Sequence, residues 1–532
     1  MYSEEIKNRM DQEPRLRKHL FCRGYLICEH KLSCEKEYPF YGQWNVTKVG
    51  KYYIYTHPLT NAFVQEDGHI AVAIIGHAYN PYTGDIDENS IAGDLCRAYS
   101  QGNENFFDKV NELTGVYVVL VAIKDELLAV QDCGGQKMLY FGLVQNQAVM
   151  TSMPQLAGDV YGLIVEEKVK TLLESKGYYR GSGFLPGNMS PYRELTRLGS
   201  NTYARLAGRR WHIHRFFPNS QLIIAKTQEQ QDNVVARIRY LMSQNIALTL
   251  KKWPRVGLSL TGGIDSKTTL ACASDYLDRC HIYSFISKDS EKLDADAASE
   301  ICKELGVPHH LYEIPQNPDE IPEYDFLRKV IEHNTSYLCK LHENEMRKYI
   351  WLEGLDDFDV EIKSDISEIG RAYTTRKYYK VKMPRVLAPR HLTIGQGRYF
   401  MEPKATKIAD DAYAKFMDET RLVEDIYGYT MHDLSYWEVR MSAWASTSLT
   451  SQEFFHDITI PYNNRNLMEL FLRFPVSLRM EDIPHKCVMR EANQRLAKLD
   501  IQIKDSYFGN KRMLLETVYY YYATHGNFYG KK

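Results

Sequence analysis

The chain has 532 residues, more than one ordinary hydrophobic core accommodates, so its length predicts two or more domains. Hydrophobic residues make up 44% and charged residues 25%, which is typical of a soluble globular protein and excludes an intrinsically disordered one. The formal net charge of -2 arises from 66 basic and 68 acidic residues, so the composition does not indicate a nucleic-acid or membrane partner.

No targeting or membrane segment is evident in the sequence. The N-terminus lacks the apolar core of a signal peptide, and the longest apolar run, residues 116–123, is too short to span a bilayer. The 10 cysteines are scattered, as expected of reduced thiols in a cytosolic enzyme, so we expect a cytoplasmic protein. Cys22, Cys28 and Cys34 lie near His30 without any CxxC pair, which favours structural cysteines over a zinc site.

Strand patterns dominate the chain up to about residue 225. Strands are predicted at residues 20–30, which include Cys22, and at residues 69–79, 116–123 and 126–132, with glycine-containing turns between them. Helices are predicted at residues 90–101 and 167–177.

The pattern changes from residue 226 onward. A long helix over residues 228–252 precedes a buried strand at 256–260, a glycine turn, a helix at 267–279, a strand at 281–287 and a helix at 294–307. This β-loop-α-β-α order predicts a parallel sheet with crossover helices, and the remainder of the chain is predicted to be mostly helical. We therefore predict an α/β multidomain protein with domains at residues 1–225 and 226–532.

The segment VGLSLTGGIDSKTTL, residues 256–270, is the most informative part of the chain. Gly262 and Gly263 let the backbone approach an anion closely, and the following helix N-terminus adds partial positive charge. Thr261 and Ser266 supply hydroxyl donors, and Asp265 is suited to hold Mg²⁺ against phosphate oxygens. The loop lacks the GxxxxGK[ST] pattern of a Walker loop. We expect a phosphate-binding loop of another kind.

This [ST]GGxDS loop after a strand resembles the pyrophosphate loop of ATP pyrophosphatases, which cleave ATP to AMP and pyrophosphate. Residues 283–310 are similar to the asparagine synthetase branch of that group. The resemblance implies an adenine-nucleotide α-hydrolase-like parallel sheet with a helical extension, and it implies ATP and Mg²⁺ as cofactors. The implied ATP-binding residues are Ser259, Leu260, Thr261, Gly262, Gly263, Asp265, Ser266, Phe285 and Ile286.

The asparagine synthetase family places a loop of the type SGEGSDE opposite the phosphate loop. Here the corresponding stretch is KSDISEIGRAY, so Asp365 stands for the catalytic Glu of the family and Glu368 for its metal-binding Asp. By this likeness Asp265 and Glu368 hold the metal, and the altered acids indicate a substrate other than aspartate. Paired carboxylates facing a triphosphate call for Mg²⁺ between them.

The resemblance extends toward the C-terminus. Residues 458–479 resemble the PFLD segment of the family, with Asn464 in place of its Asp, and HKCVMREA resembles its KxxLREA pattern. The family also uses a lysine there to neutralise the departing pyrophosphate. Lys504 is the first candidate for that lysine and Lys511 the second.

The front domain resembles class II glutamine amidotransferase domains, which implies an Ntn-like αββα sandwich. Active members need an N-terminal cysteine whose own amine acts as base, but this chain begins Met1-Tyr2-Ser3. Ile75-Gly76 replaces the Asn-Gly pair that stabilises the oxyanion, and the substrate-amine contact is replaced near Ala92 and Gly93. We predict that this domain does not hydrolyse glutamine.

Together these likenesses predict an ATP-dependent carbon–nitrogen ligase that adenylates a carboxylate of a small molecule or peptide for attack by an amine. Intramolecular lactam or macrolactam formation and amidation of a sugar acid are the candidate reactions. For a β-lactam synthetase-like Tyr–Glu pair, Tyr337 or Tyr373 would have to combine with Glu343 or Glu368. A catalytically inactive ATP-binding module, an ammonia-dependent asparagine synthetase-like enzyme and a tRNA thiolase remain open alternatives. A homodimer is a further expectation.

Overall fold

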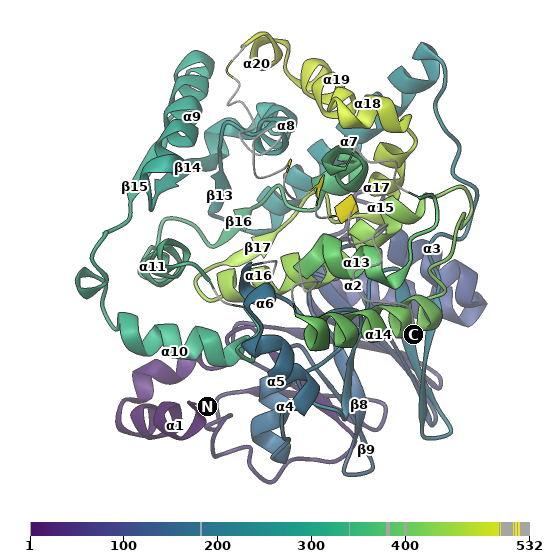
Figure 1. Cartoon of the computed structure of the whole chain (residues 1–532), viewed down its shortest axis with the longest axis vertical. Coiled ribbons are helices and arrows are strands. Elements are labelled where there is room, and N and C mark those ends of the chain that lie inside the picture. Colours follow the sequence, from purple (N-terminus) through teal and green to yellow (C-terminus); the bar gives the residue numbers. More distant parts are fainter. Residues whose placement is uncertain are drawn as a thin grey trace.

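The computed structural model describes residues 2–180, 183–339, 341–378, 384–397, 402–499, 501, 514, 517–518 and 520–521. Figure 1 shows the front half of the chain, in purple to blue, at one end of the molecule, and the rear half, in teal to yellow, at the other. We call residues 2–225 the front half and residues 226–501 the rear half.

The front half contains two six-stranded antiparallel sheets. In spatial order, the first sheet consists of β10 (Leu195–Arg197), β8 (Tyr140–Val144), β9 (Gln147–Thr151), β1 (Tyr25–Cys28), β3 (Tyr52–Thr56) and β2 (Asn45–Val49). The second consists of β12 (Arg210–Arg215), β11 (Thr202–Ala207), β7 (Glu126–Gln131), β6 (Thr114–Ile123), β5 (Ile70–Tyr79) and β4 (Ala62–Asp67).

The two sheets pack face to face because successive side chains of a strand point to opposite faces. On β5, Ala73 and Ile75 lie in the core between the sheets, whereas Val72 and Ile74 belong to the core beneath the helices. The helices of the front half are α1 (Ser3–Gln12), a 3-10 turn η1 (Pro14–His19), α2 (Glu88–Gln101), α3 (Asn103–Glu112), α4 (Pro154–Tyr161), α5 (Glu167–Glu174) and α6 (Lys176–Arg180).

Helices cover both outer faces of this pair of sheets. Ile91 of α2 and Phe106 of α3 pack in the same core as Ile74 of the second sheet. Ile6 of α1 and Leu156 of α4 pack with residues of the first sheet. This layering is the αββα sandwich that the amidotransferase resemblance predicted, and the prediction is confirmed.

The rear half is built on a five-stranded parallel sheet in the order β15 (His310–Glu313), β14 (Cys280–Ile286), β13 (Val256–Ser259), β16 (Val360–Ile362) and β17 (Asp457–Thr459). α7 (Gln228–Lys252), α8 (Ile264–Cys272), α9 (Lys292–Leu305), α10 (Tyr324–Asn334) and α11 (Glu343–Leu352) occupy the connections before, between and after these strands. The predicted parallel sheet with crossover helices is therefore confirmed.

The rest of the rear half is mostly helical, as predicted. These elements are η2 (Ser274–Arg279), η3 (Asp289–Glu291), η4 (Pro318–Glu320), η5 (Ser367–Arg371), α12 (Tyr373–Lys377), α13 (Pro389–Gly397), α14 (Pro403–Glu419), α15 (Met431–Ser435), the π-helix η7 (Tyr436–Ala445), α16 (Ser446–Gln452), α17 (Arg465–Leu472), α18 (Val476–Met480), α19 (Ile483–Ala492) and α20 (Gln494–Lys498). No helix in the described ranges has both the length and the apolar character needed to cross a membrane.

The two halves share one hydrophobic core. Residues of the second front sheet, such as Val119, belong to the same buried cluster as Ile238 of α7 and Trp437 of η7. Ion pairing crosses the boundary as well, because Arg215 Nη2 lies 2.8 Å from Glu438 Oε2, and both side chains are buried. The boundary at residue 226 stays a prediction.

One local prediction was wrong. Cys22 lies in a turn before β1 rather than within a strand. Its neighbours Phe21 and Arg23 have φ angles of +49° and +56°, in the left-handed region that no extended strand adopts. This turn aims Arg23 toward the rear half.

Candidate active site

The phosphate loop joins β13 to α8. β13 ends at Ser259 and α8 begins at Ile264, so Thr261, Gly262 and Gly263 form the connection. Within the loop, the hydroxyl groups of Thr261 and Ser266 lie 3.0 Å apart, and the Thr261 amide donates to the Ser266 hydroxyl at 3.2 Å. These bonds hold the loop in a fixed turn at the start of a helix, where the helix dipole favours an anion.

A carboxylate already binds one amide of this loop. The Gly262 amide donates to Oδ1 of Asp294, from the first turn of α9, at 3.2 Å. Burial raises the pKa of Asp294, and the hydrogen bond from Gly262 opposes that rise. A phosphate group that took this amide would displace the Asp294 carboxylate from it.

The neighbouring strand brings the predicted adenine-contacting residues to the same edge of the sheet. Ser259 pairs with Tyr283 in parallel register, so Phe285 and Ile286 at the end of β14 lie beside the residues that follow β13. The Leu260 amide donates to the carbonyl of Tyr283 at 2.9 Å, and the Ser284 hydroxyl donates to the carbonyl of Leu260 at 2.6 Å. The structure thus places both predicted ATP-contacting segments together.

Asp265 is held by the segment that follows β16. Its carboxylate accepts a hydrogen bond from the Ser367 hydroxyl and pairs with Arg371 Nη1 at 2.7 Å. Nε2 of the buried His485 lies 3.8 Å from Asp265 Oδ1. The predicted encounter between the phosphate loop and the KSDISEIGRAY segment is therefore present in the fold.

The carboxylates of Asp265, Asp365 and Glu368 lie close enough for the charge of one to change the pKa of another. Burial, followed by the charges of Asp265 and Asp365, raises the pKa of Glu368 to about 8. Burial also raises the pKa of Asp365, whereas the charge of Lys363 lowers it. Glu368 Oε2 is buried and has no hydrogen-bond partner among the described residues. Of the acids for which the structure resolves a shift here, Glu368 is the one whose pKa is raised furthest.

A divalent cation would favour the ionised form of Glu368. Mg²⁺ is usually bound by one or two carboxylates together with substrate phosphates, and Asp265 and Glu368 are the pair that the resemblance assigns to it. No group of three or more metal-ligating side chains occurs in the described part of the chain.

Sequence reasoning missed the basic side of this site. Arg371 links Asp265 to Asp482, whose Oδ1 lies 2.8 Å from Arg371 Nε. Arg376 Nη1 lies 3.0 Å from Asp482 Oδ2. His485 is buried, neither of its ring nitrogens has a hydrogen-bond partner in the described ranges, and burial lowers its pKa to about 4. The sequence feature that could have indicated these basic residues was the arginine of IGRAY, Arg371, which follows the predicted acids Asp365 and Glu368.

Several predicted residues lie elsewhere. Lys504 and Lys511 fall outside the described residues. Asn464 caps α17 and donates to the carbonyl of Glu112 at 2.7 Å, so it joins the two halves. The hydroxyl of Tyr337 lies 2.8 Å from His333 Nδ1, whereas Glu343 accepts its hydrogen bond from Tyr324. These two contacts join Tyr337 and Glu343 to different neighbours.

The absence of glutamine hydrolysis stays a prediction, and the structure places the front-half residues on which it depends. Ser3 lies in α1, where its hydroxyl donates to Asp159 at 3.3 Å. Burial raises the pKa of the Cys22 thiol to about 11, so the thiolate is suppressed. Ile75 is fully buried between the two sheets and offers no donor to an oxyanion. A Cβ on Gly76 would lie 2.3 Å from the Val116 carbonyl oxygen, so close packing of the backbone explains why a glycine occupies this position.

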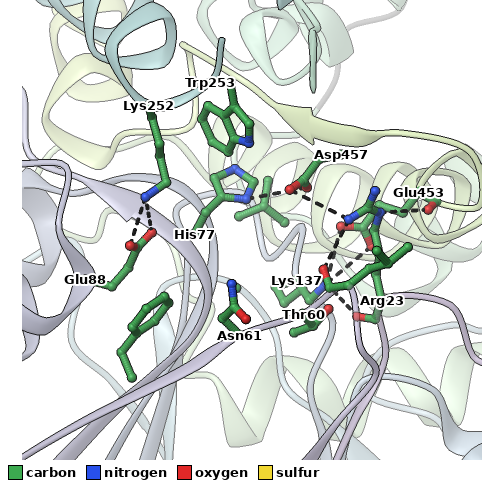
Figure 2. A pocket seen from close by; sticks show the side chains of 14 residues that line it. Arg23, Thr60, Asn61, His77, Glu88, Lys137, Lys252, Trp253, Glu453 and Asp457 are labelled. Atoms are coloured by element: carbon green, nitrogen blue, oxygen red, sulfur yellow. Dashed lines mark hydrogen bonds and ion pairs between the residues drawn. The ribbon is translucent and has the colours of Figure 1, made fainter. Parts of the chain in front are cut away.

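A polar cavity of about 110 Å³ lies where the two halves meet, next to Gly76. Figure 2 shows His77 between Trp253 and Asp457, with the Lys252–Glu88 ion pair on one side. Burial lowers the pKa of His77 to about 4, against the charge of Asp457.

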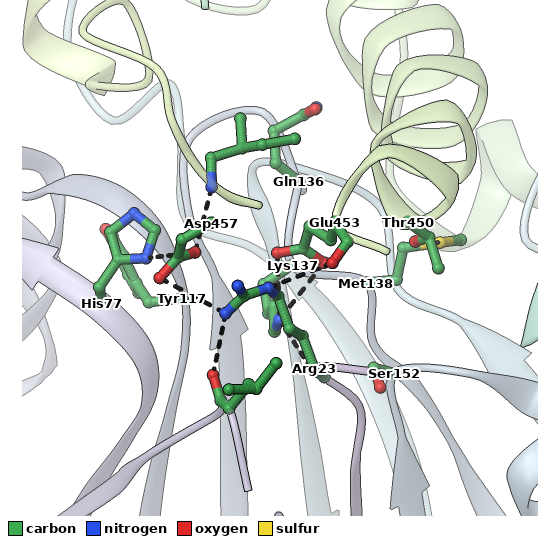
Figure 3. A network of polar contacts seen from close by, with 12 residues as sticks. Arg23, His77, Tyr117, Gln136, Lys137, Met138, Ser152, Thr450, Glu453 and Asp457 are labelled. Carbon is green, nitrogen blue, oxygen red and sulfur yellow. Dashed lines mark hydrogen bonds and ion pairs between the residues drawn. The ribbon is translucent and has the colours of Figure 1, made fainter. Parts of the chain in front are cut away.

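A network of ion pairs lines the other side of this cavity (Figure 3). Arg23 Nε donates to the Glu453 carbonyl at 3.1 Å, and Arg23 Nη1 lies 3.8 Å from Asp457 Oδ2. Lys137 Nζ lies 3.3 Å from Glu453 Oε1, and both side chains are buried. Cations of the front half thus meet acids of the rear half.

Comparison with known proteins supports the resemblance seen in the sequence. Residues 237–336 match the family model described as asparagine synthase, a region that contains the phosphate loop and β14. This confirms the asparagine synthetase-like character of that region, a type of domain that serves ATP-dependent amide ligation. A comparison with curated protein sequences gave no match.

Three solved structures show only distant likeness. Glutamine phosphoribosylpyrophosphate amidotransferase from B. subtilis, complexed with ADP and GMP, is 12% identical over 68% of this chain and 78% of its own, with a TM-score of 0.24. An allosteric regulatory enzyme of purine biosynthesis is 11% identical over 64% and 90%, with a TM-score of 0.25. Glutamine-dependent NAD⁺ synthetase from Acinetobacter baumannii, in complex with ADP, is 12% identical over 43% and 49%, with a TM-score of 0.20.

Proposed function

We propose that this chain, whose residues 237–336 match the asparagine synthase family, is an ATP-dependent carbon–nitrogen ligase of the AMP-forming type. It activates a substrate carboxylate as the adenylate, with release of pyrophosphate, and an amine then displaces AMP to form an amide. The observation that carries the proposal is the meeting of Asp265 in the phosphate loop with the segment from Asp365 to Arg371.

Each segment of the site is assigned to a different part of the nucleotide. The amides of the loop at residues 261–266 and the N-terminus of α8 suit the β- and γ-phosphates, because they offer donors and partial positive charge. The end of β14 suits the adenine base, which leaves the α-phosphorus between the two, near Asp365. Arg371 fixes the position of the Asp265 carboxylate through an ion pair at 2.7 Å.

Mg²⁺, held by Asp265 and Glu368, would supply charge neutralisation of the leaving pyrophosphate. Lys504, as in the family that this chain resembles, is proposed to add a cation on the same side, with Lys511 as the alternative.

The amine does not come from glutamine in this proposal. Ile75 and the suppressed Cys22 thiol support a front half without glutaminase activity. The nucleophile is therefore an amine that the substrate already carries, as in lactam or macrolactam closure or amidation of a sugar acid, or else free ammonia. We place this chemistry in the cytoplasm, where ATP is supplied.

The test is identification of the nucleotide products. Purified protein is incubated with ATP, Mg²⁺ and fractionated metabolite extracts, and mass spectrometry follows AMP, ADP, pyrophosphate and phosphate. We expect AMP and pyrophosphate in equal amounts, only with fractions that contain the carboxylate. ADP and phosphate as products would refute adenylation.

A nucleotide-binding module without chemistry is the second candidate. It is favoured by one observation, namely that the Asp265 carboxylate is already engaged by Ser367 and Arg371. Such a module would bind ATP but release neither AMP nor pyrophosphate with any fraction.

A further inference from the structure

Exposed apolar side chains gather on three neighbouring segments, far from one another in the sequence. We call them the apolar patch; they are Ile223 (63% exposed), Val386 (48%), Val423 (55%) and Tyr427 (51%). The Leu222 amide donates to the carbonyl of Tyr427 at 2.8 Å, which joins the first segment to the loop at residues 421–428. Arg385 Nε lies 3.7 Å from Glu424 Oε1, which joins the third segment to the same loop.

Each of these segments has a buried leucine directly beside its exposed apolar residue. Leu222, Leu387 and Leu422 are 8%, 2% and 1% exposed, and all three belong to the same hydrophobic core. These leucines anchor their segments, so the core does not require apolar side chains at positions 223, 386 and 423. Single exposed apolar residues are ordinary, whereas a group of them marks an interaction surface.

The backbone that presents Val423 and Tyr427 is held in an uncommon conformation. Arg421, Asp425 and Tyr427 have φ angles of +51°, +56° and +52°, in the left-handed region that residues other than glycine rarely adopt. Such residues persist where the surrounding structure imposes them. The Gly428 amide donates to Asp425 Oδ1 at 2.7 Å and closes the turn. A partner that binds this loop therefore does not have to order it first, which favours association.

The charges beside the patch indicate what kind of partner it fits. The Arg385 and Glu424 side chains are 89% and 47% exposed, and the exposed Arg421 and Asp425 add one further charge of each sign. The surface thus carries no net charge, which disfavours nucleic acid, an anionic membrane and a strongly acidic or basic peptide. Across a two-fold axis, by contrast, a surface meets its own copy. Two copies of an Arg–Glu pair then alternate in sign, and each cation faces an anion.

We infer that the apolar patch is the centre of a two-fold symmetric interface between two copies of this chain. Val423 and Tyr427 pack against the same patch of the second copy, and Arg385 pairs with the partner's Glu424. A stable interface buries about 800 Å² on each partner, so the loops around the patch contribute to the contact as well. This inference does not depend on the proposed function.

The test is sedimentation-velocity centrifugation of the full chain at concentrations from nanomolar to tens of micromolar. It compares the wild-type protein with Val423→Glu and Tyr427→Asp, each of which places a charge in the patch. Aspartate tolerates the left-handed conformation at position 427. The matched control is Ile164→Glu, because Ile164 is an apolar loop residue outside the patch and is 78% exposed. Circular dichroism verifies that each variant is folded.

We expect wild-type protein to sediment as a dimer, and each patch variant to raise the dissociation constant of the dimer about tenfold or more, because its new charge is buried without a partner. Ile164→Glu should leave the dimer unchanged. Arg385→Glu should weaken the dimer, and the double variant Arg385→Glu/Glu424→Arg should restore it. Wild-type protein that is monomeric at the highest concentration would overturn the inference, and so would a dimer that is unchanged in either patch variant. A double variant that dimerises no better than Arg385→Glu would overturn the pairing of Arg385 with the partner's Glu424.

Discussion

Glu368 is expected to destabilise the protein at neutral pH in the absence of metal and nucleotide. Burial and the charges of Asp265 and Asp365 raise its native pKa to about 8, from an ordinary value of 4.5. A carboxyl group whose native pKa is raised favours folding only while it is protonated. The stability that it contributes is thus fully present below about pH 4.5 and is lost as pH rises toward 8.

The size of the effect follows from these values. Between the two pKa values, the free energy of unfolding falls by about 1.4 kcal/mol per pH unit. From about pH 5 to about pH 7.5 the wild-type protein therefore loses about 3 kcal/mol relative to Glu368→Gln, which cannot ionise. With about 2.1 cal/mol/K of unfolding entropy per residue over 532 residues, 1 kcal/mol corresponds to about 1 °C in Tm.

The assay is thermal unfolding at both pH values, without Mg²⁺ and ATP. Glu368→Gln should melt about 3 °C above wild type at pH 7.5 and close to it at pH 5, while losing pyrophosphate formation. Glu300→Gln, on the exposed face of α9, is the matched control and should follow wild type. A Glu368→Gln difference that is the same at both pH values, or a lower Tm at pH 7.5, would refute the reasoning.

Three further outcomes are expected. Asp265→Asn should abolish pyrophosphate formation and lower the Tm by a few degrees, because Arg371 loses one of its two carboxylate partners; a variant that forms pyrophosphate at the wild-type rate would contradict the site. Glutamine should yield no glutamate above background in a coupled dehydrogenase assay, and release that is lost on Cys22→Ser would overturn that expectation. Lys504→Met should lower turnover about 10²–10³-fold with ATP affinity largely kept, whereas Lys511→Met should do little; the reverse pattern would move the assignment to Lys511.

The sequence predicted the architecture well because its signals are local and repeated. The apolar run at residues 70–75 predicted a buried strand, whereas the layer of helices on each face of the sheets was implied by the amidotransferase resemblance. The glycine turn between a buried strand and a helix located the phosphate loop to within a residue or two.

The basic residues of the site were not predictable in the same way. Arg371 belongs to the segment KSDISEIGRAY, which was selected for its acids, and only the folded chain shows that its guanidinium pairs with Asp265. Cys22 was predicted to lie in a strand because its neighbours are apolar. Its neighbours Phe21 and Arg23 have positive φ angles instead, in a turn from which Arg23 contacts the distant Glu453.

The ion pairs between Lys137 and Glu453, and between Arg23 and Asp457, join the two halves, so they affect whether either half can be expressed alone. Cutting the chain near residue 226 would separate these ion pairs, and also the Lys252–Glu88 pair of opposite sense, and would uncover apolar surface on both fragments. We expect that each fragment expressed alone aggregates, and that the two fragments stay soluble only when they are co-expressed and bind each other. We therefore expect that a truncation which removes the front half also abolishes the proposed ligase activity.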